Sequence, residues 1–478
     1  MKKLLISLGV LAGLLVLAGV AVLVFVDANA YKPRIESAVS DALGMEFRIR
    51  GKARLCLLPS AGIVFSDVLL RNRDTDLATA ETLRVGVKLL PLLSRHVVIT
   101  KLALEKPVIR IEKGIDGTFN YETAPGPATK EGEAPPAPLV LSSGSVSAGT
   151  IVYVDRKTKS ETSLGAIDLF VRDLSIPTAP GEKLTKGISF SGDLSAKEMK
   201  TKDRVFSDVR AKVTAGAGVY EFRPFTMKLF GGTGEGRVRV DLSGGKTVLK
   251  VHYTLAKFRA EEALAGLAQE KYLRGPMTLT PDLSARGKDV DEMKRTLTGT
   301  VSLKGDELTF HGMEIDRILS KAEDAQKLGL ADVGAFVLAG PLGSAALKGY
   351  RYGDLYRSAT REGETRIHRL VSDWTVRDGV ADARDVAFST EKNRIALKGK
   401  LDLVNGRFVD VTVAALDGKG CEKIRQKITG PFSKPRMDKV SVLQSFAEPI
   451  LGAFERGVQL LGISSCKPFY TGAVQQPE

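Results

Sequence analysis

The stretch of sequence that decides the fold class is Gly236-Arg237-Val238-Arg239-Val240-Asp241-Leu242. Charged and apolar residues alternate in it with a period of two, which is typical of a β-strand with one polar and one apolar face. A related phrase, a glycine followed by a short run and Asp-Leu, ends at Leu194 and again at Leu403. We interpret these phrases as successive hairpins of a long antiparallel meander that is apolar on one face.

Similar alternating segments, separated by turn residues, continue on both sides of this stretch. They begin at Phe47 and run to Val413. Two helical patches, residues 260–269 and 316–328, interrupt them. A run rich in proline, residues 123–138, is expected to form an exposed, flexible loop between two strand regions. The expected fold class is therefore mainly β, with an extended antiparallel sheet and a few short α-helices.

The first residues are typical of a membrane anchor. Lys2 and Lys3 precede 23 residues without a charge, from Leu4 to Val26. A helix of that length spans about 34 Å, enough to cross a hydrocarbon core of about 30 Å, and the two lysines would stay in the cytoplasm. The alternative is cleavage after Ala30, because Ala-Asn-Ala has the form of a signal-peptidase site. The apolar run exceeds the usual h-region of about 7–15 residues, which favours an uncleaved anchor.

After the anchor, residues 31–43 carry apolar side chains at helical spacing, and Gly44 follows at the usual C′ position. The chain is then expected to divide into five segments: residues 1–30, the cytoplasmic N-terminus and transmembrane anchor; 31–122, an amphipathic helix and a first β region; 123–138, the Pro-rich loop; 139–420, a long antiparallel β region; and 421–478, a C-terminal helical segment flanked by cysteines.

Composition limits the class of partner. The 70 Lys and Arg residues outnumber the 56 Asp and Glu residues and give a net charge of +14. Such a charge favours acidic surfaces, and for an exported chain these are anionic lipid headgroups rather than nucleic acid. The basic residues are spread along the strands, with no like-charged block and no interleaved aromatic residues. We expect no nucleic-acid partner.

The three cysteines bear on stability, because disulfides persist in exported proteins. Cys421 and Cys466 flank the C-terminal segment, and a bond between them would close a loop. The chain-entropy model gives this bond a contribution of about 4 kcal/mol to the free energy of unfolding. Cys56 would then remain a thiol. Sequence alone does not decide the pairing, since any two of the three cysteines could bridge.

Motifs that carry chemistry are missing from the sequence. The glycines of residues 232–236 resemble a dinucleotide loop, but strand patterns on both sides favour a turn or bulge. No P-loop and no nucleophile elbow occurs. The four histidines are far apart and not at metal-ligand spacing, so we expect ordinary strand or loop residues: His96, His252, His311 and His368. We expect that the protein is not an enzyme and that it binds no metal or cofactor.

The C-terminal segment has an apolar stripe at helical spacing between Leu443 and Leu461, interrupted at Pro449. We expect a helix that caps the last strand through this stripe. The alternative is an amphipathic element that touches the outer membrane or a partner protein.

Several stretches, in order along the chain, resemble the AsmA family of bacterial envelope proteins. The stretches are Tyr31-Lys32-Pro33-Arg34-Ile35-Glu36, Asp67-Val68-Leu69-Leu70-Arg71-Asn72, Lys101-Leu102-Ala103-Leu104-Glu105-Lys106-Pro107, Asp116-Gly117-Thr118-Phe119-Asn120, Ala396-Leu397-Lys398-Gly399-Lys400-Leu401-Asp402-Leu403 and Ile428-Thr429-Gly430-Pro431-Phe432-Ser433-Lys434-Pro435. Each is weak by itself, but their order and spacing make the resemblance specific.

The resemblance implies a fold and a function. AsmA-like proteins are similar to chorein-type bridge-like lipid-transfer proteins, in which an elongated, curved antiparallel sheet holds acyl chains along an apolar groove. It implies an inner-membrane, single-pass protein with its body in the periplasm, which moves phospholipid toward the outer membrane and supports outer-membrane biogenesis. An envelope protein at the distal end is a further expected partner. The groove candidates are Val238, Val240, Leu401 and Leu403.

A different class of function fits the same chain. It could be a non-enzymatic envelope scaffold, or an assembly factor for outer-membrane proteins, without lipid transport.

Overall fold

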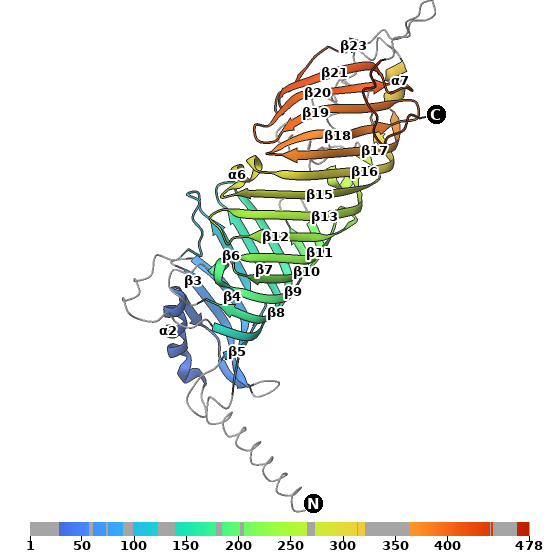
Figure 1. Cartoon of the computed structure of the whole chain (residues 1–478). Helices are drawn as coiled ribbons and strands as arrows, with labels where there is room; N and C mark the ends of the chain where they lie inside the picture. Colours follow the sequence, from blue (N-terminus) through green and yellow to red (C-terminus); the bar gives the residue numbers. More distant parts are fainter. Residues whose placement is uncertain are drawn as a thin grey trace, which may run out of the picture. The chain divides into compact units, whose positions relative to one another are not determined.

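The structure is a computed structural model that describes residues 28–56, 61–72, 75–88, 99–122, 139–177, 184–200, 205–264, 273–312, 314–320, 363–439, 441–442 and 466–477. These residues are mainly β, in a long antiparallel sheet with few short helices (Figure 1), which confirms the predicted class. The predicted anchor from Leu4 to Val26, the Pro-rich loop and the apolar stripe after Leu443 lie outside them. No helix among the described residues is long and apolar enough to cross a membrane.

The chain divides into two compact units, residues 1–227 and 228–478. The division falls inside the β region of residues 139–420 that the sequence analysis expects to be one segment. Each unit is described by itself.

The first unit contains a short helical start and the first half of the strands. Its elements are η1 (Ala28–Tyr31), α2 (Lys32–Leu43), β1 (Glu46–Ile49), β2 (Ala53–Cys56), β3 (Gly62–Asn72), β4 (Thr75–Val87), β5 (Ile99–Glu105), β6 (Val108–Lys113), β7 (Leu139–Asp155), β8 (Ser160–Ile176), α4 (Leu184–Gly187), β9 (Ser189–Lys200), β10 (Val205–Gly216) and β11 (Val219–Leu229), whose last two residues belong to the second unit.

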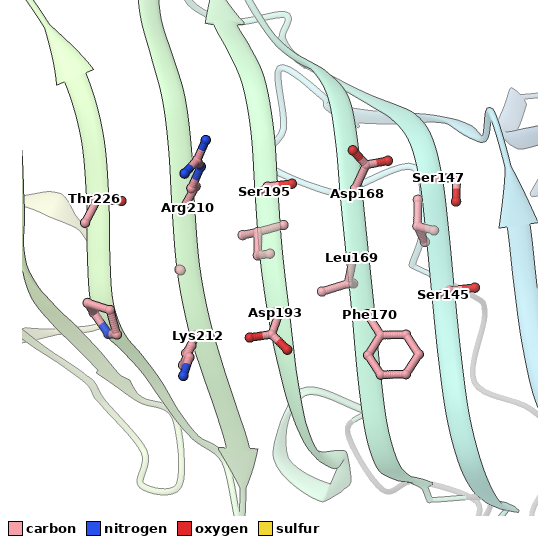
Figure 2. A pocket seen from close by; sticks show the side chains of 14 residues that line it. Ser145, Ser147, Asp168, Leu169, Phe170, Asp193, Ser195, Arg210, Lys212 and Thr226 are labelled. Carbon is pink, nitrogen blue, oxygen red and sulfur yellow. The ribbon is translucent and has the colours of Figure 1, made fainter.

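Strands β7 to β10 form an antiparallel ladder with register shifts at β7 and β8, and Figure 2 shows part of it. One step before this ladder departs from the expected antiparallel meander, because β5 and β6 both pair with β7 in parallel. They follow one another along β7, with Lys106 between them at a positive φ of 47°. A parallel pair needs a long connection, and residues 114–138 between β6 and β7 supply it.

A position that the sequence pattern indicates as a turn between two strands is a bulge within one strand. The apolar runs around Val64 and Leu69 look like two strands in the sequence, but they form the single strand β3. Asp67 between them has a positive φ of 51°, and its carbonyl oxygen accepts the N–H of Arg50 at 2.9 Å. Such a residue bends a strand and increases its twist without ending the sheet.

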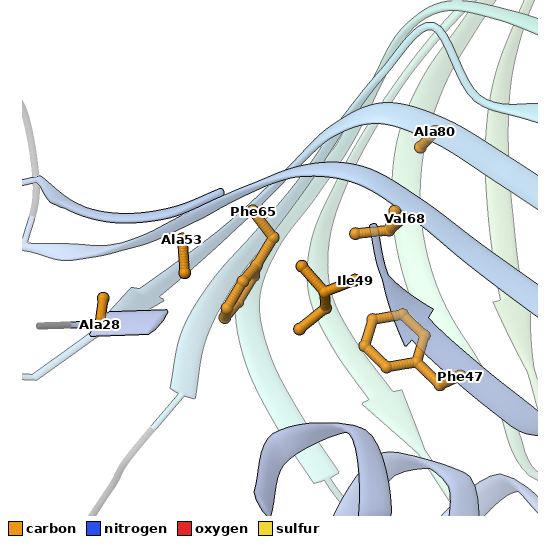
Figure 3. Close-up of a cluster of buried hydrophobic side chains, with 7 residues drawn as sticks. All are labelled: Ala28, Phe47, Ile49, Ala53, Phe65, Val68 and Ala80. Atoms are coloured by element: carbon orange, nitrogen blue, oxygen red, sulfur yellow. The ribbon is translucent and has the colours of Figure 1, made fainter. Parts of the chain in front are cut away.

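The helix α2 packs against the start of the sheet. A cluster of buried side chains lies under it (Figure 3): Ala28, Phe47, Ile49, Ala53, Phe65, Val68 and Ala80. Ile35 and Val39, one turn apart on α2, pack against this cluster. The helix ends as predicted, because Gly44 takes a positive φ of 64°, which is favourable without a Cβ atom.

The described residues of the second unit form an antiparallel meander with three short helices. Its elements are β12 (Gly232–Asp241), β13 (Thr247–Arg259), α5 (Ala260–Leu264), β14 (Leu273–Arg274), β15 (Pro276–Gly287), α6 (Val290–Arg295), β16 (Thr298–His311), α7 (Ile315–Ser320), β17 (Glu364–Arg377), β18 (Val380–Ser389), β19 (Arg394–Asp402), β20 (Arg407–Leu416), β21 (Glu422–Pro431), β22 (Arg436–Met437) and β23 (Ser441–Val442). Adjacent long strands from β12 to β21 pair in chain order, while β14 pairs with β16.

One boundary and one helix differ from the sequence analysis. Strands continue past residue 420, since β21 pairs with β20 along its length, so the predicted helical segment of residues 421–478 begins as sheet. The helix α6 was not predicted. Its signal is local: Asp289 accepts the N–H of Glu292 at 2.8 Å, and the Glu292 carboxylate accepts the N–H of Lys288 at 3.0 Å. These reciprocal bonds satisfy amides at a helix start, as in a capping box.

The glycines of residues 232–236 form neither a turn nor a bulge, which corrects the sequence expectation. They lie in β12 and pair with β13, where Gly236 stands opposite Tyr253. A Cβ atom on Gly234 would overlap the hydroxyl of Tyr253, and one on Gly236 would lie 2.7 Å from the ring atom Cδ2 of the same residue. Gly234 therefore makes room for the buried Tyr253, and Gly236 allows close approach of the backbone of β13, where the carbonyl oxygen of His252 would lie 2.2 Å from a Cβ atom.

Candidate functional site

The sheet of the first unit has two chemically different faces. Across β8, β9 and β10, the residues Ile167, Ala196 and Val209 stand in register and are buried. The next apolar row on the same face, two residues along each strand, is Leu169, Leu194 and Ala211. Residues between these rows point to the other face, because side chains alternate along a strand. Strands β8, β9 and β10 thus present a continuous apolar face.

The second unit repeats this arrangement over more strands. Register relations connect one row across β12, β13, β15, β16, β17, β18, β19 and β20: Val238, Val251, Leu283, Gly299, Val376, Ala381, Leu401 and Phe408. Every member of the row is apolar or glycine. On the opposite face the neighbouring row begins with Arg237, His252 and Asp282. An apolar face of this kind favours contact with hydrocarbon over contact with water.

Burial changes along this row. Val238, Val251 and Leu283 are half-buried. Val376 and Leu401 are each 1% exposed, and Phe408 is 3% exposed. Water reaches the row between β12 and β15 but not between β17 and β20. The half-buried part is the section that a bound apolar molecule can reach without opening the core.

The four groove candidates from the sequence occupy different environments. Val238 and Val240 lie on the apolar face of β12 and are both half-buried. Leu401 lies on the same face but inside the closed core. Leu403 follows β19 in a turn, where its N–H donates to the carbonyl oxygen of Gly379 at 2.9 Å. The structure brings Val238, Val240 and Leu401 onto one face and leaves Leu403 at its edge.

Several charged residues on the polar face of the second unit form ion pairs. The described histidines each face a carboxylate: His252 with Asp282 at 3.3 Å, His311 with Glu364 at 2.6 Å and His368 with Glu307 at 3.2 Å. Hydrogen bonds from His368 and Arg366 hold the pKa of Glu307 below its ordinary value. Within the described ranges there is no group of three or more His, Cys, Asp or Glu residues that could hold a metal ion. His96 lies outside these ranges.

The cysteine pair joins the last part of the chain to the sheet. Cys421 and Cys466 form a disulfide with their Cα atoms 6.1 Å apart, while Cys56 lies half-buried in β2. Beyond Cys466, the N–H of Phe469 donates to the carbonyl oxygen of Gly420 at 2.8 Å. Tyr470 and Val474 pack into a buried cluster with small residues of β18, β19 and β20.

Residues 466–477 were not recognised as a packing element from the sequence. They form no helix or strand, so periodicity carries no signal there. Their attachment depends on single contacts, such as the guanidinium of Arg394, which donates to the carbonyl oxygen of Val474 at 3.1 Å. The one usable signal is Cys466, whose pairing predicts that the chain end is held near Cys421.

The comparison with protein families agrees with this architecture. The model of the AsmA family matches residues 1–207 and, in a second, overlapping segment, residues 191–386. No curated protein and no solved structure matches the chain. The two segments together cover most of the sequence, from the predicted anchor into β18. The chain therefore belongs to the AsmA family, as its sequence pattern predicts.

Proposed function

We propose that this protein binds phospholipid acyl chains along the apolar face of its sheet and conducts them between membranes. The observation that carries the proposal is the row from Val238 to Phe408, apolar throughout and half-buried over β12 to β15. Acyl-chain burial contributes roughly 0.8 kcal/mol per CH₂ group and is non-directional. Because each CH₂ group contributes little and needs no fixed position, a long apolar face can bind an acyl chain while the acyl chain still moves along it.

The proposed setting follows from the N-terminal sequence. The run from Leu4 to Val26 anchors the protein in the inner membrane, and the body lies in the periplasm. Lipid enters from the inner-membrane side and moves toward the outer membrane or a partner protein at the far end. Membership in the AsmA family fits an envelope protein of this kind. The protein acts without a catalytic residue, a metal or a cofactor.

A photo-crosslinking experiment tests the proposal directly. A photoreactive phenylalanine analogue is placed at Val238 in the full-length protein in cells, and the irradiated protein is analysed for bound lipid by mass spectrometry. The matched control carries the analogue at Arg237, the adjacent residue on the opposite face of β12. Phospholipid attached at Val238 but not at Arg237 supports the proposal.

The rival function, a scaffold without lipid, predicts a different result. In that case the analogue at Val238 captures protein segments or nothing, and a purified full-length sample carries no co-purified phospholipid in native mass spectrometry. Either of these results, no lipid captured at Val238 or no phospholipid in the purified protein, would contradict the lipid-conduit proposal.

A further inference from the structure

A hollow of about 720 Å³ lies on the polar face of the first unit, opposite the apolar rows just described. Figure 2 shows its side chains on β7 to β11. Two cross-strand rows form its floor: Ser145, Phe170, Asp193 and Lys212 in one, and Asp168, Ser195 and Arg210 in the other. The rows stand two residues apart on each strand. The hollow is therefore a site separate from the apolar face.

The hollow contains an exposed aromatic ring among polar groups. Phe170 is 44% exposed, although its neighbours on the opposite face, Leu169 and Val171, are half-buried and buried. The guanidinium of Arg172 lies 5.3 Å from the ring centroid. Figure 2 shows the Asp193 carboxylate between the Phe170 ring and Lys212. An apolar ring flanked by a carboxylate and hydroxyl groups offers a flat contact surface with hydrogen-bonding groups at its edge.

Two cations of the hollow are available to a ligand. Arg210 and Lys212 are exposed on β10, and within the described residues neither side chain has a hydrogen-bond or ion-pair partner. Their register partners on β9 are Ser195 and Asp193. Thr226 of β11 adds a hydroxyl group beside them. This side of the hollow suits an anionic group.

The two carboxylates are partly engaged and fixed in position. Asp168 accepts the N–H of Ala148 through Oδ1 at 3.0 Å, and Asp193 binds Arg172 through Oδ2 at 2.8 Å. Each side chain keeps a second oxygen that can accept a hydroxyl proton. Carboxylates that accept hydroxyl groups repel a chain of phosphates, so their presence argues against a nucleic-acid strand.

We infer that this hollow binds a saccharide that carries an anionic substituent. The Phe170 ring contacts the apolar face of one sugar ring, and Asp168 and Asp193 accept its hydroxyl groups. Arg210 and Lys212 bind the anionic substituent. Phe170 and Lys212 stand two strands apart, roughly 10 Å, a span that two linked sugar rings fill. The inference is independent of the acyl-chain proposal, because it concerns the opposite face of the sheet.

The anionic group could come from two sources with shared chemistry, and the experiment distinguishes them. Full-length protein in detergent micelles is titrated calorimetrically with a bisphosphorylated glucosamine disaccharide, as in a deacylated glycolipid headgroup. A second titration uses an N-acetylglucosamine–N-acetylmuramic acid disaccharide, as in a cell-wall strand. The neutral N-acetylglucosamine disaccharide is the reference. We expect one of the anionic disaccharides to bind saturably and at least about tenfold more tightly than the neutral one.

Variants locate the binding. Phe170→Ala, Arg210→Glu and Lys212→Glu are each expected to weaken binding of the anionic disaccharide about tenfold or more. Lys250→Glu, an exposed lysine on β13 of the second unit, is the matched control and should leave binding unchanged. All four side chains are exposed, so the thermal midpoint should stay at the wild-type value and report an intact fold.

Several outcomes would overturn the inference. These are no saturable binding of either anionic disaccharide, equal binding of the neutral one, or binding that the three hollow variants do not change. Inorganic phosphate that binds as tightly as the disaccharides, or a single-stranded oligonucleotide that binds more tightly, would also refute it.

Discussion

Val238 and Leu401 stand in one cross-strand row although 162 residues of chain separate them. The row passes through Val251, Leu283 and Gly299, so antiparallel register alone connects the two residues. They differ in their access to water: Val238 is half-buried, whereas Leu401 is 1% exposed. The same substitution should therefore act on binding at one position and on folding at the other.

Val238→Asp and Leu401→Asp test this difference. We expect Val238→Asp to fold with a small loss of stability. It should lose bound phospholipid, because a carboxylate that hydrocarbon covers loses its hydration at a large cost in free energy. Leu401→Asp should lower the free energy of unfolding by about 3 kcal/mol or more, since it places a charge in a closed core. Thermal unfolding and lipid content of the purified protein are measured together. Equal losses of unfolding free energy at both positions would contradict the conclusion that the row is open to water at Val238 and closed at Leu401.

Gly234→Ala should destabilise the second unit because the new methyl group overlaps the Tyr253 hydroxyl. The expected cost is about 1–3 kcal/mol in chemical denaturation, as for other overpacked cores. The control Gly245→Ala should be close to neutral, since a Cβ atom there has no heavy atom within 4 Å. In a Tyr253→Val background the cost of Gly234→Ala should fall. An unchanged cost in that background would show that Tyr253 is not the cause.

The phenol of Tyr470 donates a hydrogen bond to Asp385 and accepts one from the N–H of Val474 at 3.1 Å. Burial and the neighbouring Asp385 carboxylate raise the pKa of Tyr470 well above its ordinary value of 10.0. A raised pKa contributes stability that is present below pH 10 and declines as the pH rises above 10. Tyr470→Phe should therefore reduce the fall in unfolding free energy between pH 10 and pH 11. An identical fall in wild type and variant would contradict this coupling.

Glu112 of β6 accepts hydrogen bonds from Nε of Arg110 at 2.7 Å and Nε of Arg156 at 3.0 Å, and these bonds hold its pKa below the ordinary 4.5. A lowered pKa contributes stability above pH 4.5 that is lost as the pH falls through the pKa of the folded state. Glu112→Gln should lower the unfolding free energy by about 1–2 kcal/mol at pH 7 and by less at pH 3. Glu161→Gln, an exposed control on β8, should have little effect at either pH. If Glu112→Gln lowers the unfolding free energy equally at both pH values, the variant loses packing rather than a charge interaction.

Removal of the disulfide should loosen the end of the chain. The bond between Cys421 and Cys466 closes a separation of 45 residues, for which the chain-entropy model predicts a loss of about 4 kcal/mol in Cys466→Ser. Cys56→Ser is the control. Peptide mapping without reductant should recover Cys421 and Cys466 in one linked pair. A linked pair that contains Cys56 would contradict the structure.

Local sequence patterns predicted most strands but not their pairing. The alternation at Gly236–Leu242 indicates a strand with two unlike faces, and the structure confirms it as β12. The parallel placement of β5 and β6 on β7 has no signal in the alternation, because either direction of pairing buries the same face. The glycines at 234 and 236 were misread for a similar reason: only the close approach of His252 and Tyr253 on the next strand explains them.

The hollow around Phe170 shows the same limit. In the sequence, Asp168-Leu169-Phe170-Val171-Arg172 is an ordinary alternating strand in which Phe170 falls on the polar side. Arg210 and Lys212 are two of many spread basic residues. Arg210 and Lys212 lie near Phe170 and Asp193 because of the register of β8, β9 and β10. Register arises from the pairing of whole strands and is not written at any single position.

The sequence by itself determined that this chain is mainly β, that its strands are apolar on one side, and that it belongs to the AsmA family. Periodicity suffices for the first two conclusions because side chains alternate along any strand, while the family follows from the order and spacing of the stretches that resemble AsmA proteins. Only the tertiary structure decided that Val238 is accessible while Leu401 is closed, that Cys421 pairs with Cys466 rather than Cys56, and that a polar hollow gathers around Phe170. Burial and pairing depend on residues far away in the chain, so the pattern around one residue does not contain them.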